Sequence, residues 1–325
     1  MVTFKQVARS YAASVRAAER EQKRHAKETA KLYKEQLKQL EILSAEKTVK
    51  NYQDYLDILV SIHKNCSNEK INWEEVLNDE EPEKPLKKQD NELIARERLE
   101  QFKPLFFAKI FGANKKKKLL EEDLKNAINK DIEEYEKSVE IYKDWEKTQS
   151  IAKGIRNYDI KAYAEAINFF EPFSDLSDMG SKLEISFNKE FIEIDLHVND
   201  STVIPNYVVN QTKTGKLSKK DMPKGKFNEL YQDYVCGALL RVGRETLAYL
   251  PVKKVIIHAL SEMLNTTNGH LELTPIVSAI IVPETVDKLN FENLDPSDSM
   301  KNFIHNMKFT KTNGFSKVEK LNIEN

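Results

Sequence analysis

The first half of the chain places apolar side chains at spacings of three and four residues, which is the spacing of one face of a helix. A stripe of this kind begins at Phe4 and Val7, returns at Leu37 and continues to Leu59. Residues 4–64 contain neither proline nor glycine, so no breaker interrupts a helix in this stretch. The pattern predicts one long helix, about 90 Å in length at about 1.5 Å per residue.

Further helices are expected before residue 156. The short segments 71–77 and 90–102 are separated by an acidic, proline-bearing stretch near 78–90, which is typical of a linker. Residues 119–155 form a second long apolar stripe, and we expect this helix to fold back on the first as an antiparallel pair. The pattern therefore predicts a long-helix or coiled-coil region over residues 1–156.

From residue 157 onward, the pattern changes to short alternating or wholly apolar segments, which are typical of strands. Elements are predicted in the order α-β-β-β-α-β-β-α, followed by one short strand. The predicted helices cover residues 160–170, 227–249 and 295–307, and the predicted strands cover residues 182–187, 191–198, 203–211, 252–259, 275–282 and 315–321. The expected fold class is therefore α+β, with an extended helical N-terminal half followed by a mixed α/β domain with a central sheet at 157–325.

Composition limits the classes of protein that this sequence can encode. Charged residues make up 32% of the chain, yet the formal net charge is −1, so a protein that coats nucleic acid over its whole surface is not expected. No segment approaches the roughly 18–20 consecutive apolar residues that span a bilayer. Cys66 and Cys236 are the only cysteines, and neither belongs to a metal-binding motif, so a reducing cytoplasm is expected.

Positive charge is concentrated in residues 213–226, which contain six lysines and one aspartate. Gly215, Pro223 and Gly225 break helices and strands, so this segment is predicted to be a loop. A lysine-rich loop is suited to binding phosphate groups, although a solvated surface loop has the same composition. The candidate phosphate-binding residues are Lys216, Lys219, Lys220, Lys224 and Lys226 in the loop and Arg241 and Arg244 on the helix after it.

Two other basic regions leave alternatives open. Residues 1–40 carry an excess of lysine and arginine, which suits either a phosphate backbone or the solvated face of a coiled coil. Phe106 and Phe107 precede the lysine run 115–118, a combination found where helices meet in a core and also in interfacial membrane anchors. We expect the core interpretation and no membrane partner.

The C-terminal half also holds a set of residues suited to phosphodiester chemistry. Asp195 lies on the second predicted strand, and Gln211-Thr212-Lys213 ends the third. With the order α-β-β-β-α-β, this arrangement resembles the restriction-endonuclease-like nucleases, in particular those of Mrr type. The resemblance implies a Mg²⁺ site at Asp195, catalytic roles for Asp195, Gln211, Lys213 and Glu165, and metal-assisted hydrolysis of phosphodiesters. It also implies a role in handling foreign DNA.

These features together predict a cytoplasmic protein that engages DNA or RNA, with or without nuclease activity. The alternative is a non-catalytic assembly protein whose N-terminal helices self-associate or dock a partner protein, and whose α/β domain is a binding module. The sequence contains no phosphate-binding loop and no nucleophile-elbow motif, so nucleotide hydrolysis and serine hydrolysis have no support.

Overall fold

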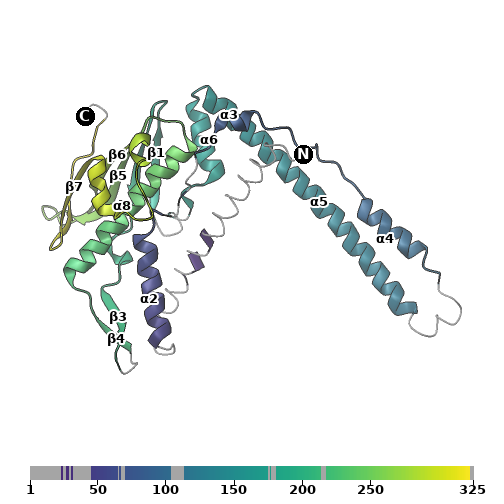
Figure 1. The fold of residues 1–325 in the computed structure, drawn as a ribbon, viewed down its shortest axis with the longest axis horizontal. Helices are drawn as coiled ribbons and strands as arrows, with labels where there is room; N and C mark the ends of the chain where they lie inside the picture. The colour runs from purple at the N-terminus through teal and green to yellow at the C-terminus, as the bar shows by residue number, and fades with distance from the viewer. Residues whose placement is uncertain are drawn as a thin grey trace. The chain divides into compact units, whose positions relative to one another are not determined.

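The structure is a computed structural model that describes residues 45–64, 66, 70–103, 113–174, 176, 181–213 and 217–322, with the isolated positions 23, 24, 27, 28 and 31. Two compact units make up the chain (Figure 1). The first unit contains Met1–Asn72 and Gly154–Asn325, and the second contains Trp73–Lys153. In sequence, the second unit is therefore an insertion into the first.

The second unit consists of one long helix and the chain that runs back along it. Its elements are α3 (Trp73–Leu77), α4 (Asp90–Glu100) and most of α5 (Ala113–Arg156). The Gln149 side chain donates to the carbonyl of Val76, and the Asn91 side chain donates to Asp131 over 2.7 Å. The later residue of the segment 73–102, Asn91, thus pairs with the earlier residue of α5, Asp131. Residues 73–102 therefore run antiparallel to α5. Figure 1 shows α4 lying along α5.

The prediction of a long helix over residues 119–155 is confirmed by α5. Its antiparallel neighbour among the described residues is the segment 73–102, and not the helix predicted at residues 4–64. Of that first helix, the structure describes α2 (Ala45–Val60) and the isolated positions named above. The coiled-coil N-terminal half therefore stays a prediction.

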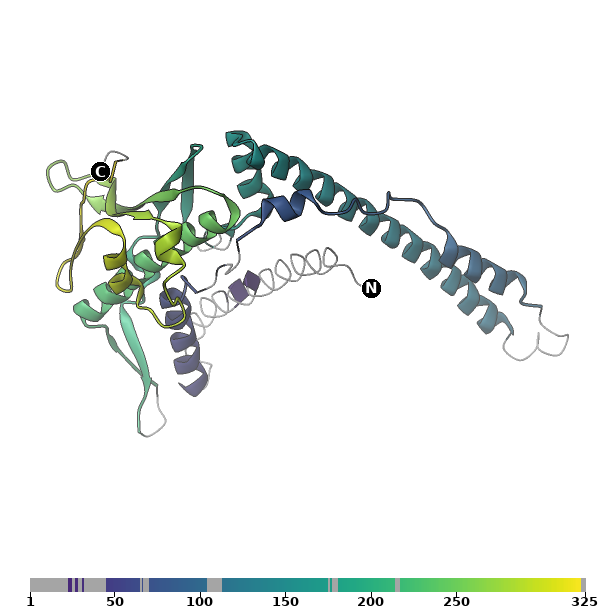
Figure 2. The same ribbon diagram turned by 45° about the horizontal axis from the view of Figure 1, so that its top comes forward.

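The first unit contains a mixed sheet that packs against α8. Its elements are α2, α6 (Ile160–Phe170), β1 (Lys182–Phe187), β2 (Phe191–His197), η2 (Ser201–Val203), β3 (Tyr207–Gln211), β4 (Leu217–Asp221), α8 (Lys224–Tyr249), β5 (Lys254–Leu264), β6 (Leu271–Ile281), α9 (Pro283–Val286), α10 (Pro296–Ser299), η3 (Met300–Asn302), β7 (Ile304–Thr310) and β8 (Gly314–Ser316). The main sheet has the order β1-β2-β5-β6-β7-β8, and β3 pairs with β4 in a separate hairpin (Figure 2). Strands β2 and β5 are parallel, because α8 carries the chain back between them, and the other neighbouring strands are antiparallel.

From Tyr234 to its end, helix α8 is buried on every side, so this part of the helix lies inside the unit. Two glycines permit close approaches on different sides of the helix. A methyl group at Gly243 would meet a side-chain carbon of Ile281 at 3.0 Å, and one at Gly237 would meet Ile62 at 2.8 Å. The sheet therefore packs on one side of α8, and the chain that follows α2 packs on another.

The alternation that the sequence shows in β2 sorts its side chains between the two faces of the sheet. Ile192 is in register with Val255, which is in register with Ile281, so the buried face of β2 is the face that packs on α8. Glu193 and Asp195 stand on the opposite face, called the outer face below. This confirms the mixed α/β architecture with a central sheet.

The third predicted strand and the lysine-rich segment have a different structure from the one expected. The strand predicted at 203–211 forms β3, but it pairs with β4 and does not enter the main sheet. Residues 213–226, expected to be a loop, contain β4 and the first turn of α8. Of the three breakers, Pro223 precedes α8, Gly225 lies in the first turn of α8, and Gly215 lies outside the described residues. None of them falls within residues 217–221, so Lys219 and Lys220 lie in a strand.

The helix predicted at residues 295–307 is much shorter in the structure. Asp295 caps it as expected, because its side chain accepts a hydrogen bond of 2.8 Å from the backbone N–H of Asp298. Helix α10 nevertheless ends at Ser299, and the backbone from Ile304 pairs with β6 as strand β7. Pairing with an existing sheet edge overrides the local helical signal here.

Candidate functional site

The exposed basic surface of the first unit lies on the β3–β4 hairpin and the start of α8. Val209 and Met222 are buried and hold the hairpin to the rest of the unit. The lysines of this segment that the structure describes are all exposed: Lys213, Lys219, Lys220, Lys224 and Lys226. Lys216, the sixth, lies outside the described residues. We call these five described side chains the lysine platform.

Two tyrosines of α2 bind the hairpin and the η2 segment that precedes it. The Tyr52 hydroxyl donates a 2.8 Å hydrogen bond to the carbonyl of Tyr207, and the Tyr55 hydroxyl donates one of the same length to Val203. The rings of Tyr52 and Tyr207 stack with their centroids 6.0 Å apart. Burial and neighbouring tyrosines raise the pKa of both α2 hydroxyls to about 12, so they remain donors at neutral pH. The hairpin is therefore held in place by α2, as Figure 1 shows.

Carboxylates do not neutralise the lysine platform. Within the part of the chain that the structure describes, none of its five ammonium groups forms an ion pair. The Lys219 ammonium lies 3.6 Å from the centroid of the Tyr207 ring, a cation–π contact that leaves its charge in place. Lys220 is opposite Val208 in the hairpin, so it stands on the other face from Lys219. The platform thus presents positive charge on both faces of the hairpin.

Arg241 and Arg244 do not belong to this surface, contrary to the sequence-based expectation. Their exposed fractions are 2% and 7%, because both lie in the enclosed part of α8. The Arg244 guanidinium donates a 2.8 Å hydrogen bond to the carbonyl of His63 and lies 3.7 Å from the centroid of the Phe291 ring. Burial, the largest effect, lowers the pKa of Arg244 from its ordinary value. Arg244 is therefore a buried residue that connects two segments distant in sequence, those of His63 and Phe291.

The residues expected to form a nuclease site are not brought together. Asp195 lies on β2, whereas Gln211 ends β3 and Lys213 follows it, so they belong to different sheets. Glu165 is an exposed residue of α6. The expectation failed because it required 203–211 to lie next to β2, where the structure places β5.

The carboxylate of Asp195 binds a lysine that the sequence reasoning did not select. The ammonium of Lys320 lies 2.6 Å and 2.7 Å from its two oxygens. Among the described residues there is no group of three histidine, cysteine, aspartate or glutamate side chains that could hold a metal ion. The Mg²⁺ site that the resemblance implies therefore stays a prediction.

A hydrogen-bonded row of side chains crosses the outer face beside Asp195. The two ring nitrogens of His258 lie 2.7 Å from the Ser278 hydroxyl and 3.1 Å from a carboxylate oxygen of Glu193. His258 and Ser278 are completely buried. Burial, the largest effect, holds the pKa of His258 below its usual value, and Lys320 acts in the same direction, against Glu193 and Asp195. The only signal in the sequence is one histidine inside the apolar strand of residues 252–259.

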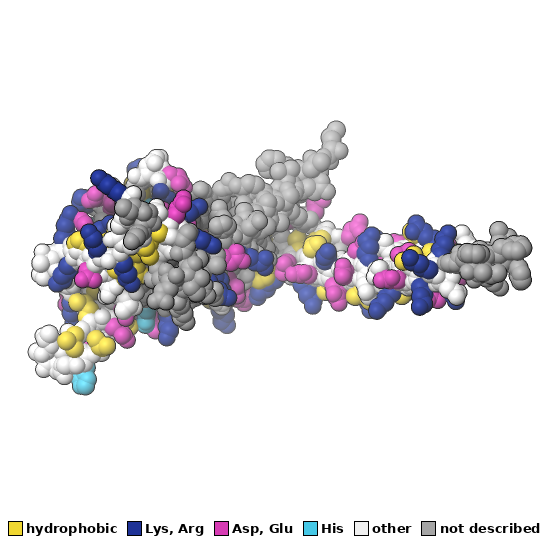
Figure 3. All heavy atoms as spheres, turned by 90° about the horizontal axis from the view of Figure 1, so that it is seen from below, with side chains coloured by type: hydrophobic (Ala, Val, Ile, Leu, Met, Phe, Trp, Pro, Cys, Tyr) yellow, Lys and Arg dark blue, Asp and Glu magenta, His cyan; other side chains and the backbone are white. Residues whose placement is uncertain are grey.

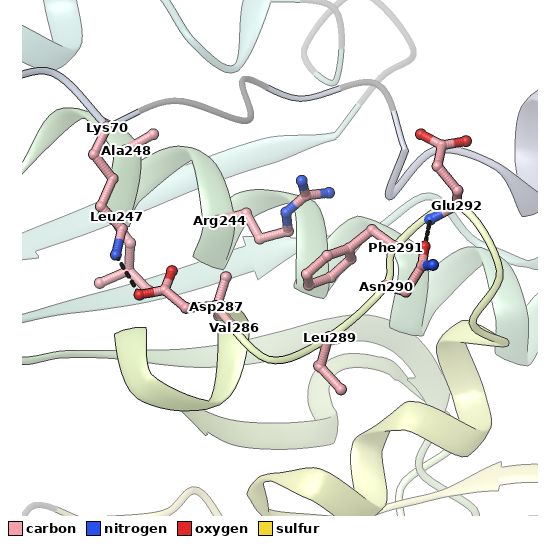
Figure 4. A pocket seen from close by; sticks show the side chains of 10 residues that line it. All are labelled: Lys70, Arg244, Leu247, Ala248, Val286, Asp287, Leu289, Asn290, Phe291 and Glu292. Carbon is pink, nitrogen blue, oxygen red and sulfur yellow. Dashed lines mark hydrogen bonds and ion pairs between the residues drawn. The ribbon is translucent and has the colours of Figure 1, made fainter.

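A cavity of about 480 Å³ opens beside the far end of α8 (Figure 4). Its lining includes Lys70, Arg244, Leu247, Asp287, Phe291 and Glu292. Lys70 and Asp287 form an exposed ion pair of 2.8 Å at one end, as the dashed line shows. The two cations and two carboxylates of the lining balance each other, so the cavity has no excess charge with which to select an anionic ligand.

Comparison with known proteins does not assign the chain to a family. No family model matches the sequence, and no curated protein or solved structure matches it either. No helix in the described residues is long and apolar enough to cross a membrane. Phe106 and Phe107, the residues of the alternative membrane anchor, lie outside the described residues.

Proposed function

We propose that the protein binds the phosphate backbone of nucleic acid through the lysine platform. The observation that supports the proposal is a group of five exposed lysines, without carboxylate partners in the described chain, on the β3–β4 hairpin and the start of α8. Tyr52 bonds the hairpin, and Tyr55 bonds the η2 segment that precedes it. The hairpin backbone is already held by α2, so the conformational freedom lost when phosphates bind is that of the lysine side chains. The proposal places the protein in the cytoplasm, where nucleic acid is accessible.

The physics of this interaction is electrostatic and local. Each lysine that neutralises a phosphate releases condensed counterions, so the affinity falls with salt by a slope of about 0.7–0.9 per phosphate contact. Elsewhere in the described residues, charges of both signs are mixed, as Figure 3 shows for the helical second unit. A net charge of −1 therefore permits one basic site without general attraction to polyanions.

The proposal is tested with fluorescence anisotropy of labelled single- and double-stranded DNA and RNA at several salt concentrations. In the triple variant Lys213→Glu, Lys220→Glu, Lys224→Glu, we expect the affinity to fall at least about tenfold and the salt slope to fall by about 2–3. The matched control is Lys125→Glu, Lys137→Glu, Lys143→Glu, which makes the same charge change at exposed positions of α5. Equal losses in both variants would show that the lysine platform is not the site.

The proposal covers binding and includes no hydrolytic step. Asp195 is bound by Lys320 at both oxygens, whereas Gln211 ends a strand of a different sheet and Lys213 follows that strand. The same titrations carried out with Mg²⁺ and with EDTA examine the nuclease prediction directly. Cleavage that requires Mg²⁺ and disappears in Asp195→Ala would restore it.

Assembly through the helical half is the second candidate function, and one observation favours it. Large apolar side chains of α4 and α5 are about half exposed, among them Leu93, Ile94, Leu119, Ile132 and Ile141. Such side chains on long helices are suited to packing against a further helix. Light scattering of the full chain tests this function, and we expect Ile132→Lys with Ile141→Lys to reduce the measured mass. A monomer at all concentrations contradicts self-association.

A further inference from the structure

Residues 317–322, called the strap below, lie across the outer face of the sheet, form hydrogen bonds or ion pairs with three of its strands and pack on a fourth. The backbone N–H of Val318 donates to the carbonyl of Pro275 over 2.9 Å. The side chain of Asn306 donates to the carbonyl of Glu319 over 3.0 Å. The ammonium of Lys320 binds both oxygens of Asp195, and Leu321 packs on the apolar side chains of β5 and β6.

The strap also closes over the buried row of Glu193, His258 and Ser278. The backbone N–H of Leu321 donates a 2.9 Å hydrogen bond to the Ser278 hydroxyl oxygen. The hydroxyl proton of Ser278 is then available to Nδ1 of His258, which must be unprotonated to accept it. The one proton of the neutral ring is therefore on Nε2, from which it is donated to Glu193.

Neutral His258 satisfies every hydrogen bond in this row, and a second proton on the ring disrupts it. With both ring nitrogens protonated, Nδ1 becomes a donor to Ser278, whose oxygen already accepts from Leu321. The Ser278 hydroxyl proton then loses His258, the acceptor that the described residues offer it, at a completely buried position. The new positive charge also lies close to Lys320.

We propose that the strap is a pH-sensitive cover of the outer face, locked in place while His258 is neutral and released when His258 is protonated. The charged groups that face His258 are Glu193 and Asp195 from β2 and Lys320 from the strap, and Ser278 faces it from β6. The two carboxylates favour the charged ring. Burial and Lys320 oppose it, and both are removed when the strap leaves.

The direction of the effect follows from this difference. The pKa of His258 is lowered from its ordinary 6.5 while the strap is docked, and it returns toward that value when water reaches the ring. The docked state therefore binds the proton less tightly, so docking is strongest above the undocked pKa and weakens as the pH falls. One proton limits this change to about tenfold per pH unit. Release exposes Glu193, Asp195 and the apolar surface under Leu321.

Hydrogen exchange of the full chain between pH 5 and pH 8, corrected for intrinsic exchange rates, tests the proposal. Protection of the strap amides is expected to fall toward pH 5, by up to about tenfold per pH unit, while that of α8 does not fall. In His258→Asn, whose side chain does not titrate, strap protection is expected to be independent of pH. A flat wild-type profile, or a pH dependence that survives in His258→Asn, overturns the proposal.

Two further measurements separate the switch from a general loosening of the strap. Asn306→Ala removes a strap hydrogen bond that is not part of the His258 row, so we expect lower protection by the same factor at every pH. If His258→Asn does not fold, an NMR titration of His258 in the wild-type chain replaces it. A midpoint that coincides with the loss of strap protection supports the proposal, and a clearly different midpoint overturns it.

Discussion

Asp233 shows how a single side chain can act against the stability of the fold. It lies on α8 and is partly buried, with Glu229, Asp295 and Asp298 nearby. Burial, the largest effect, and these three carboxylates raise its pKa to about 6, against a hydrogen bond with Ser297 that lowers it. Because this value is above the ordinary 3.8, the contribution of Asp233 to stability is fully present below about pH 4 and is lost as the pH rises through 6.

Asp233→Asn is therefore expected to stabilise the protein at neutral pH. The free energy of unfolding should rise by about 1–2 kcal/mol at pH 7.5 and by almost nothing at pH 4, since the acid is then protonated in both states. Urea denaturation at four values between pH 4 and pH 7.5 measures the difference. Asp123→Asn, at an exposed position of α5, is the control. A gain that is the same at pH 4 and at pH 7.5 contradicts the assigned cause.

At the scale of elements, α4 begins at a cap that a different helix supplies. Gln89, which precedes α4, makes no side-chain capping bond. The carboxylate of Asp131 on α5 instead accepts hydrogen bonds from the backbone N–H of Asn91 (3.2 Å) and of Glu92 (2.8 Å). Burial raises the pKa of Asp131, but the bonds from Glu92 and Asn91 more than offset this, and the pKa lies below its usual value. The first turn of α4 thus depends on α5 for its cap.

Asp131→Asn is expected to loosen α4 while α5 stays helical. The amide keeps the shape of the carboxylate but loses the charge that binds two backbone N–H groups. Hydrogen exchange of the first-turn amides of α4 should quicken in the variant, and Glu133→Gln, at an exposed position, should leave it unchanged. In the wild type, this contribution is present above the unfolded pKa and is lost as the pH falls through the depressed folded value. Unaltered exchange in Asp131→Asn contradicts the capping role.

At the scale of the whole molecule, the first unit is assembled from segments that are far apart in sequence. The chain after α2 reaches α8 through the bond from Arg244 to the carbonyl of His63, and through the backbone bond from Ile71 to Ala248. Arg244 also packs on Phe291. The second unit, Trp73–Lys153, lies between these segments in sequence, so the fold of the first unit depends on contacts formed across that insertion.

Arg244→Lys tests this long-range joint. Lysine keeps the charge but lacks the planar guanidinium that can stack on Phe291 while it bonds the His63 carbonyl. The free energy of unfolding is expected to fall by about 2–3 kcal/mol, as for other buried networks that lose one member. Arg156→Lys, at an exposed position at the end of α5, should have little effect in the same urea denaturation. Equal stability of the two variants contradicts a structural role for Arg244.

Part of the candidate site could be predicted from the sequence because the evidence for it is local. The lysines of residues 213–226 are exposed where the structure describes them, as their density in a polar segment indicates. The burial of Arg241 and Arg244 could not be predicted in this way. Their helix carries polar groups like a surface helix, yet α2 and the sheet enclose it. Burial depends on the segments that pack around a residue in space, and the residues next to it in the sequence do not indicate which segments these are.

The sequence by itself determined the helices of residues 90–102, 119–155 and 227–249 and the strands around β2, β5 and β6, because periodicity and breakers act within about one element length. Only the tertiary structure decided that β3 leaves the main sheet, that β7 replaces a helix, and that Lys320 meets Asp195. A strand pattern specifies a buried face but not a neighbouring strand. The two side chains of that ion pair are 125 positions apart in the sequence, and the fold brings them together. The local pattern of apolar and polar residues therefore determined the helices and strands. Contacts between residues distant in sequence determined which side chains meet on the outer face of the sheet.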